Sequence, residues 1–262
     1  MDKPLKVRHS GAIGDIIYSL PYIKSLGKKI DFYIGEHSFV SGESNKDTPE
    51  ALTSMIKNMY PLSKEIYNKN HSNFKMLKRL LKHQDYINDV FPDEENTQYG
   101  IDLNDFRRSW NSKNSILDIV NNHFGNISYK KDESFLKTET ISNFEKTCVC
   151  FRSPRYVDES GKERYKNVIS SLKDQTAIEQ FIFVGIEKEY EYFSKNILNI
   201  DYYKTKDMYD VSVIINSCPI GIYNCSAPLA IAVGLSKPRF IEHPTNEIVN
   251  SVKQNSILER FF

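Results

Sequence analysis

Apolar and polar positions follow two recurring patterns along the chain. Short apolar runs bounded by turn residues predict strands, and runs with an apolar residue every three or four positions predict helices. A proline inside the first helical run, Pro21, predicts a kink or a short first helix. In the first half the predicted strands are 5–10, 29–35, 85–91 and 99–104, and the predicted helices are 14–26, 50–60, 72–83 and 115–125.

The second half repeats this alternation after a charged, weakly patterned stretch. Strand–helix–strand order predicts parallel sheets with right-handed crossovers, which is an α/β fold. We therefore expect a first domain over 1–140 and a second over 141–244, with a terminal helix 245–262 that could pack back on the first. The predicted strands are 146–151, 179–185, 201–205, 219–224 and 238–242, and the predicted helices are 166–174, 188–197, 207–218 and 226–235.

Composition narrows the class of protein. The chain has 262 residues, 40% hydrophobic and 26% charged, which is typical of an ordered globular protein. A net charge of +1 gives no global attraction to nucleic acid or membrane. No run approaches the roughly 20 apolar residues that span a bilayer, and the N-terminus lacks the apolar core of a secretory signal. We expect a cytoplasmic protein, with phage origin in a host cytoplasm as one option, and four reduced, mostly buried cysteines.

Two glycines and an acid follow the first predicted strand, in "HSGAIGD". Gly11 and Gly14 allow a tight turn before a helix whose free amides favour an anion. A dinucleotide fingerprint would need glycine where His9 stands, which disfavours a nicotinamide-dependent oxidoreductase, although Glu36 could replace its ribose-binding acid. Asp15 has two interpretations: a carboxylate that stabilises the helix N-terminus, or a general base in a cleft.

A second turn, "YNCSAPLAIAVGL", joins a predicted strand to an apolar helix. Ser226 is placed to cap that helix, and Pro228 suits its first turn. The N-terminus of such a helix is a phosphate site, although an ordinary buried helix has the same pattern. A charged loop over 152–165 follows the strand 146–151 and carries Arg152, Arg155, Lys162 and Arg164, which could neutralise a diphosphate or simply be solvated.

Three segments together resemble one family, the heptosyltransferase-like (family 9) glycosyltransferases. They are "GAIGDIIYSLPYIKSL", "YGIDLNDFRRS" and "NCSAPLAIAVGLSKP", and their order and spacing agree over nearly the whole chain. The resemblance implies a GT-B-like fold, in which two Rossmann-like domains with parallel sheets face each other across a cleft. It also implies an inverting, metal-independent transfer that needs no cofactor, from a nucleotide-diphosphate sugar to a hydroxyl acceptor.

The resemblance assigns roles to individual residues. Asp15 matches the family's base, and Lys162 best matches its donor-phosphate lysine. We expect a saccharide acceptor. The residues expected on the donor and phosphate side are Gly14, Arg152, Arg155, Lys162, Asn224, Ser226 and Ala227. The residues expected on the acceptor side are His9, Glu36, His37, Arg107 and Trp110.

Departures from the family leave alternatives open. The family's Asp, Gly and His in the late motif are Cys225, Ala227 and Ala230 here, which weakens any assignment of ADP-heptose as the donor. One alternative is a phage-type DNA glycosyltransferase acting on a 5-hydroxymethyl pyrimidine, with the basic helix 75–83 as its DNA face. Another is a non-catalytic nucleotide- or sugar-binding protein. No Asp-x-Asp pair occurs in the chain, which disfavours the metal-dependent glycosyltransferases that use one.

Overall fold

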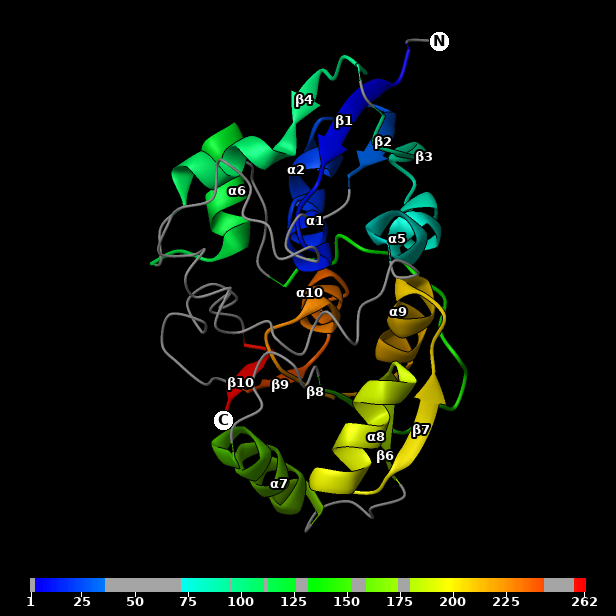
Figure 1. Cartoon of the computed structure of the whole chain (residues 1–262), viewed down its shortest axis with the longest axis vertical. Helices are drawn as coiled ribbons and strands as arrows, with labels where there is room; N and C mark the ends of the chain where they lie inside the picture. The colour runs from blue at the N-terminus through cyan, green and yellow to red at the C-terminus, as the bar shows by residue number, and fades with distance from the viewer. Residues whose placement is uncertain are drawn as a thin grey trace.

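A computed structural model gives the arrangement of most of the chain (Figure 1). The predicted helix 50–60 falls outside the part that it describes. None of the helices in the described ranges has the length and apolarity that crossing a bilayer requires. The described residues are 3–35, 72–94, 96–110, 113–125, 132–151, 159–173, 180–242 and 257–262.

The first half is built on a four-stranded sheet with the order β3-β2-β1-β4. All its pairings are parallel, as the strand–helix alternation predicts. The first strand lies inside the sheet, so the turn that follows it opens at the centre of the sheet's carboxyl edge. The strands are β1 (Leu5–His9), β2 (Ile30–Ile34), β3 (Ile87–Pro92) and β4 (Ile101–Asp102).

The helices of this half confirm the predicted capping and the predicted break. The run 14–26 divides at Ser19 into two short helices, with Pro21 in the first turn of the second. Ser72 caps its helix by accepting a hydrogen bond from the amide of Lys75 at 3.2 Å. A 3-10 helix that the pattern did not predict follows β4. The helices are α1 (Ile13–Tyr18), α2 (Leu20–Ser25), α5 (Asn73–Lys82), η2 (Leu103–Ser109) and α6 (Ile116–Phe124).

The second half is built on a six-stranded parallel sheet with the order β10-β9-β8-β5-β6-β7. From β5 the chain adds β6 and β7 on one side of the sheet, and it then returns to add β8 on the other side of β5. The point where the direction reverses is where open α/β sheets bind their ligands. The strands are β5 (Thr147–Cys150), β6 (Phe181–Gly185), β7 (Asp201–Lys204), β8 (Gly221–Tyr223), β9 (Arg239–Ile241) and β10 (Glu259–Phe261).

Two predictions for this half are wrong in part. The loop predicted over 152–165 becomes helix from Glu159 onward, so Lys162 and Arg164 lie on a helix rather than in a loop. A terminal helix was predicted over 245–262, but residues 259–261 form the strand β10, which pairs with β9 in the second sheet; residues 245–256 lie outside the described part. The helices are α7 (Glu159–Lys173), α8 (Glu187–Asn196), α9 (Met208–Ser217) and α10 (Ala227–Gly234).

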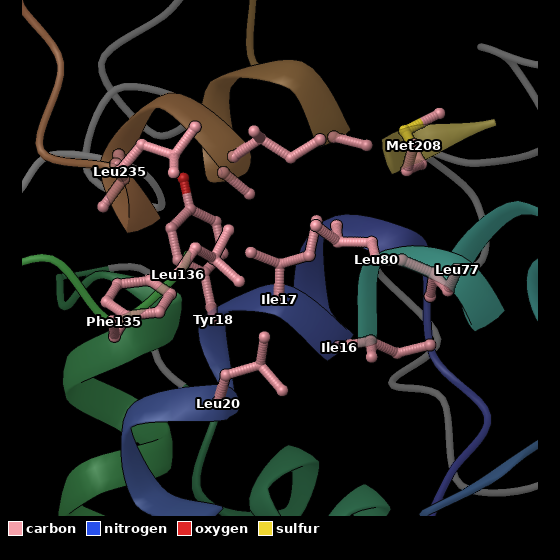
Figure 2. Packing of buried hydrophobic residues seen from close by; sticks show 14 of the residues in the cluster. Ile16, Ile17, Tyr18, Leu20, Leu77, Leu80, Phe135, Leu136, Met208 and Leu235 are labelled. Atoms are coloured by element: carbon pink, nitrogen blue, oxygen red, sulfur yellow. The ribbon is translucent and has the colours of Figure 1, made fainter. Parts of the chain in front are cut away.

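One hydrophobic cluster spans both halves, and a second lies within the second half. Residues of α1 and α5 in the first half and of α9 and α10 in the second belong to the same buried cluster. Figure 1 shows α10 directly below α1 and α9 below α5. In Figure 2 the ring of Tyr18 extends from α1 toward Leu235 near the end of α10, beside Phe135 and Leu136 of the connecting segment. The contact between α1 and α10 therefore fixes how the carboxyl edges of the two sheets face each other.

Candidate active site

Asp15 lies in the first turn of α1, just beyond the carboxyl end of the central strand β1. Its side chain is 21% exposed, so the carboxylate is partly covered but still reachable from solvent. Helix α1 has no side-chain cap at its N-terminus. The unpaired amides of a first turn favour a negative charge there, which is consistent with both interpretations of Asp15.

Arg107 is the ionic partner of Asp15. Its Nη2 lies 3.3 Å from Asp15 Oδ2, and its Nη1 donates to Asn104 Oδ1 at 2.9 Å. Arg107 comes from η2, which follows β4, and β4 pairs with β1 at the same edge of the sheet. The sequence placed both residues in the site, but the pattern gave no indication that they are paired.

A wider ionic network lies beside this pair. Arg8 on β1 contacts Asp93 at 2.8 Å and Asp102 at 3.0 Å, and Tyr99 donates a hydrogen bond to Asp93. Burial works to raise the pKa of Asp93, but the hydrogen bonds from Arg8 and Tyr99 outweigh it and hold that pKa below its usual value. The carboxylate therefore stays charged, and it anchors the end of β3 to the centre of the sheet.

His9, predicted on the acceptor side, is fully buried. Its Nδ1 accepts a hydrogen bond from the amide of Gly11 at 2.8 Å, so the ring supports the turn that leads to α1. Asn73, at the start of α5, donates to the carbonyl oxygen of Gly11 at 2.9 Å and holds the same turn from the other side. The turn is thus held in place by two buried polar side chains that precede and follow it in the chain.

The donor-side turn after β8 meets α1 directly. A Cβ built at Gly14 would lie 4.0 Å from the Ala227 Cα and 4.0 Å from the Ala230 Cβ. Ser226 is the N-cap residue of α10, but its side chain does not cap the helix; its hydroxyl donates to the carbonyl oxygen of Asn224 at 3.2 Å. The glycine motif and the late motif, more than 200 residues apart, are therefore packed together.

The basic residues of α7 have partners that the sequence did not predict. Lys162 Nζ lies 5.8 Å from the centre of the Tyr192 ring on α8. Arg164 is held by Glu242, with its Nη2 2.6 Å from Glu242 Oε1. Glu242 is fully buried at the end of β9, and the sequence analysis missed it. The sequence did carry a signal for Glu242, because it is an acidic residue directly after an apolar strand.

Trp110, predicted on the acceptor side, is bonded through its backbone to Arg107. Trp110 ends η2, where its amide donates to the carbonyl oxygen of Arg107 at 3.2 Å, and its ring packs on the main core. In the part of the chain that the structure describes, no three His, Cys, Asp or Glu side chains are placed together to hold a metal ion. All four cysteines are buried free thiols. The predicted residues that lie outside the described ranges are Glu36, His37, Arg152 and Arg155.

Comparisons with solved structures identify the class of fold. E. coli heptosyltransferase WaaC, solved with ADP, superposes with a TM-score of 0.53 at 10% identity, covering 99% of this chain and 92% of that one. E. coli ADP-heptose lps heptosyltransferase II gives 0.56 at 10% identity, covering 99% and 90%. A family 9 glycosyl transferase from Veillonella parvula gives 0.54 at 12% identity, covering 99% and 85%.

These likenesses extend over nearly the whole chain, and the two parallel sheets match the two-domain GT-B fold that the resemblance implied. The predicted fold is therefore confirmed. No protein-family model matches the sequence, and a sequence search among curated proteins finds no match. At identities of 10 to 12% the shared feature is the fold, and activity has to be argued from the site.

Proposed function

We propose that the chain is an inverting, metal-independent glycosyltransferase that takes a sugar from a nucleotide-diphosphate sugar to a hydroxyl acceptor, with a saccharide as the preferred acceptor. One observation carries this proposal: the first turn of α1, with Asp15, packs against the first turn of α10 through Gly14 and Ala227. A carboxylate and a helix N-terminus that suits phosphate are thereby neighbours across the two halves of the fold.

In the proposed step Asp15 acts as the base. The acceptor hydroxyl transfers its proton to the Asp15 carboxylate while its oxygen forms a bond to the anomeric carbon from the face opposite the leaving group. The bond from the anomeric carbon to the diphosphate oxygen breaks, and the nucleoside diphosphate leaves with the electron pair. A positioned base of this kind contributes on the order of 100- to 10,000-fold.

The donor would lie at the reversal point of the second sheet, between β5 and β8. The turn Asn224–Ala227 follows β8, and the Ser226 hydroxyl is bonded to Asn224 rather than to the helix. The amides of the first turn of α10 are therefore not covered by a side-chain cap and can stabilise the charge that develops on the leaving diphosphate. Lys162, Arg152 and Arg155 are proposed to add positive charge.

Ligand binding followed by turnover tests the proposal. ADP, GDP, UDP and dTDP are each added to the protein and its thermal unfolding is followed. A nucleotide present at 100 times its Kd stabilises the protein by about 2.7 kcal/mol. The matching sugar nucleotides are then tested for release of nucleoside diphosphate. Turnover supports an enzyme. Stabilisation without turnover of any sugar nucleotide would favour the non-catalytic binding protein. If no nucleotide stabilises the protein and no sugar nucleotide is turned over, both the enzyme and the binding protein are contradicted.

Modified DNA remains the second candidate acceptor because of one surface feature. A hollow of about 560 Å³ lies over α5 and α9 and is lined by four cations of α5. Two of these cations already have acidic partners: Arg79 contacts Asp207 and Asp210 at the start of α9, and Lys82 contacts Asp89. The remaining charge of the hollow is therefore modest, which favours a saccharide. The residues that line it are Lys75, Lys78, Arg79, Lys82, His83, Glu139 and Tyr209.

The two acceptors are separated by a transfer assay. A sugar nucleotide with a labelled sugar is added to a duplex that contains 5-hydroxymethylcytosine and to an unmodified duplex, each at two salt concentrations. Binding that rests on phosphate contacts falls steeply with salt. Label on the modified duplex alone, lost at high salt, would show that the acceptor is DNA and not a saccharide. Label on neither duplex supports the saccharide acceptor.

A further inference from the structure

Arg107 holds one particular oxygen of Asp15. Its Nη2 contacts Oδ2 at 3.3 Å, and within the described residues that carboxylate has no other ion pair. The two side chains are equally covered, at 22% and 21% exposure. An ion pair at this depth is less screened by solvent than one on the open surface. The contact therefore restrains the Asp15 carboxylate and leaves Oδ1 as the oxygen that can receive a proton.

The Arg107 guanidinium is itself held in place by hydrogen bonds through Asn104. Arg107 Nη1 donates to Asn104 Oδ1 at 2.9 Å, and the same oxygen accepts hydrogen bonds from the amide and the hydroxyl of Ser10, both at 3.1 Å. Asn104 is held in turn by Asp102, which accepts from its Nδ2 at 2.7 Å. Arg107 thus reaches Asp15 from a support that begins on β4 and is tied to the end of β1.

Gly11 provides the space through which the guanidinium passes. A Cβ at this position would lie 2.4 Å from Arg107 Nη2 and 2.4 Å from His9 Cε1. Both distances are far shorter than any normal contact, and the His9 ring is fully buried. A side chain at position 11 would therefore clash with both the Arg107 guanidinium and the His9 ring, and the contact of Arg107 with Asp15 would be disturbed.

We propose that Arg107 is a positioning residue that orients Asp15 for proton transfer, and that Gly11 is required because it admits the Arg107 guanidinium. The inference rests on the proposed function, since it presupposes that Asp15 is the base. It changes the role expected from the sequence, in which Arg107 contacts the acceptor. Bases in enzymes are commonly oriented by a third group in this way.

A double-mutant cycle tests the inference. Wild type, Arg107→Gln, Asp15→Asn and the double variant are compared in kcat and KM, with the sugar nucleotide that the wild type turns over fastest and water as the acceptor. A displacement of about 1 Å can cost roughly 100-fold, so we expect Arg107→Gln to lower kcat by about 10- to 100-fold with the donor KM within about threefold. The double variant should be no slower than Asp15→Asn, because Arg107 acts through Asp15.

Three more variants supply a second measurement, a control and a conservative replacement. Gly11→Ala leaves the arginine in the chain and should reproduce the loss in kcat, with folding checked by urea unfolding. Arg108→Gln removes the neighbouring arginine, which is 77% exposed and pairs with Asp105, and should stay within about threefold of wild type. Arg107→Lys keeps the positive charge but lacks the planar, forked guanidinium. Its kcat should therefore recover only part of what Arg107→Gln loses.

The outcomes separate the inference from the proposed function. A wild-type rate for Asp15→Asn would overturn the proposed base and the inference with it. A large loss in Asp15→Asn with a wild-type rate in Arg107→Gln would overturn the inference and leave the base in place. Losses that multiply in the double variant would show that Arg107 acts independently of Asp15, which also contradicts the inference.

Discussion

Gly14 of α1 faces Ala230 of α10 so closely that a methyl group on Gly14 would lie 4.0 Å from the Ala230 Cβ. Small residues on both helices allow this approach. Because Asp15 is the next residue along α1, the contact also sets how far the proposed base lies from the proposed phosphate site. The packing of the two halves and the geometry of the site therefore depend on the same pair of helices.

Substitutions at Gly14 test this dependence. Gly14→Ala adds a methyl group at ordinary contact distance, so unfolding in urea should show stability unchanged or raised by about 0.4–1 kcal/mol. Gly14→Leu must push α1 from α10, and overpacking of this kind costs about 1–3 kcal/mol. The turnover of Gly14→Leu should fall as well. Equal stability for the two variants would mean that the helices are not in tight contact.

Lys162→Ala tests the proposed donor side. A charged hydrogen bond to phosphate is worth about 1.5–3 kcal/mol, so the donor KM should rise about 10- to 100-fold. Lys166→Ala, on the exposed face of the same helix, is the matched control and should leave KM unchanged. If both variants bind the donor like wild type, Lys162 is not a phosphate partner, and Arg152→Ala and Arg155→Ala become the variants to measure.

Glu259→Gln tests how the C-terminal strand is attached. Glu259 Oε1 lies 2.8 Å from Arg239 Nη2, and both side chains are only 2% exposed. Removing the carboxylate leaves a buried guanidinium charge without its counter-ion, which costs about 3–5 kcal/mol. Urea unfolding should show this loss, whereas Arg260→Gln, at the exposed neighbour, should change stability by less than about 0.5 kcal/mol. Similar stabilities would contradict the pairing of β10 with β9.

Chelation tests the metal-independent mechanism. The sequence has no Asp-x-Asp pair, and the charges expected near the diphosphate are Lys and Arg. Turnover should therefore be unchanged after dialysis against EDTA. A rate abolished by EDTA and restored by Mg²⁺ or Mn²⁺ would show that a metal ion neutralises the diphosphate instead.

Much of the fold could be predicted because each element carries its own signal. The break in the run 14–26 follows from Pro21, and the start of α5 follows from Ser72 as an N-cap. The strand β10 carried no such signal. Its short charged and aromatic segment joins the sheet through a buried ion pair between Glu259 and Arg239, and such a pair depends on tertiary contacts that a local pattern does not contain.

The sequence could name candidate site residues but not their pairing. Asp15 and Arg107 were both expected there, yet only the pairing of β4 with β1 brings them within 3.3 Å. Ser226 was expected to cap α10, but its hydroxyl bonds to Asn224. Arg164 was expected in a charged loop, and it is held by the buried Glu242. Each of these differences arises from a partner distant in sequence or from local geometry that residue preferences do not determine.

Asp15→Asn is the most direct test of the central claim, that this carboxylate is the base of a sugar transfer. The amide keeps the shape of the side chain but cannot take the proton. Donor binding and the urea midpoint should match wild type, while sugar transfer falls by on the order of 100- to 10,000-fold. A transfer rate within a few-fold of wild type, with donor binding intact, would contradict the account.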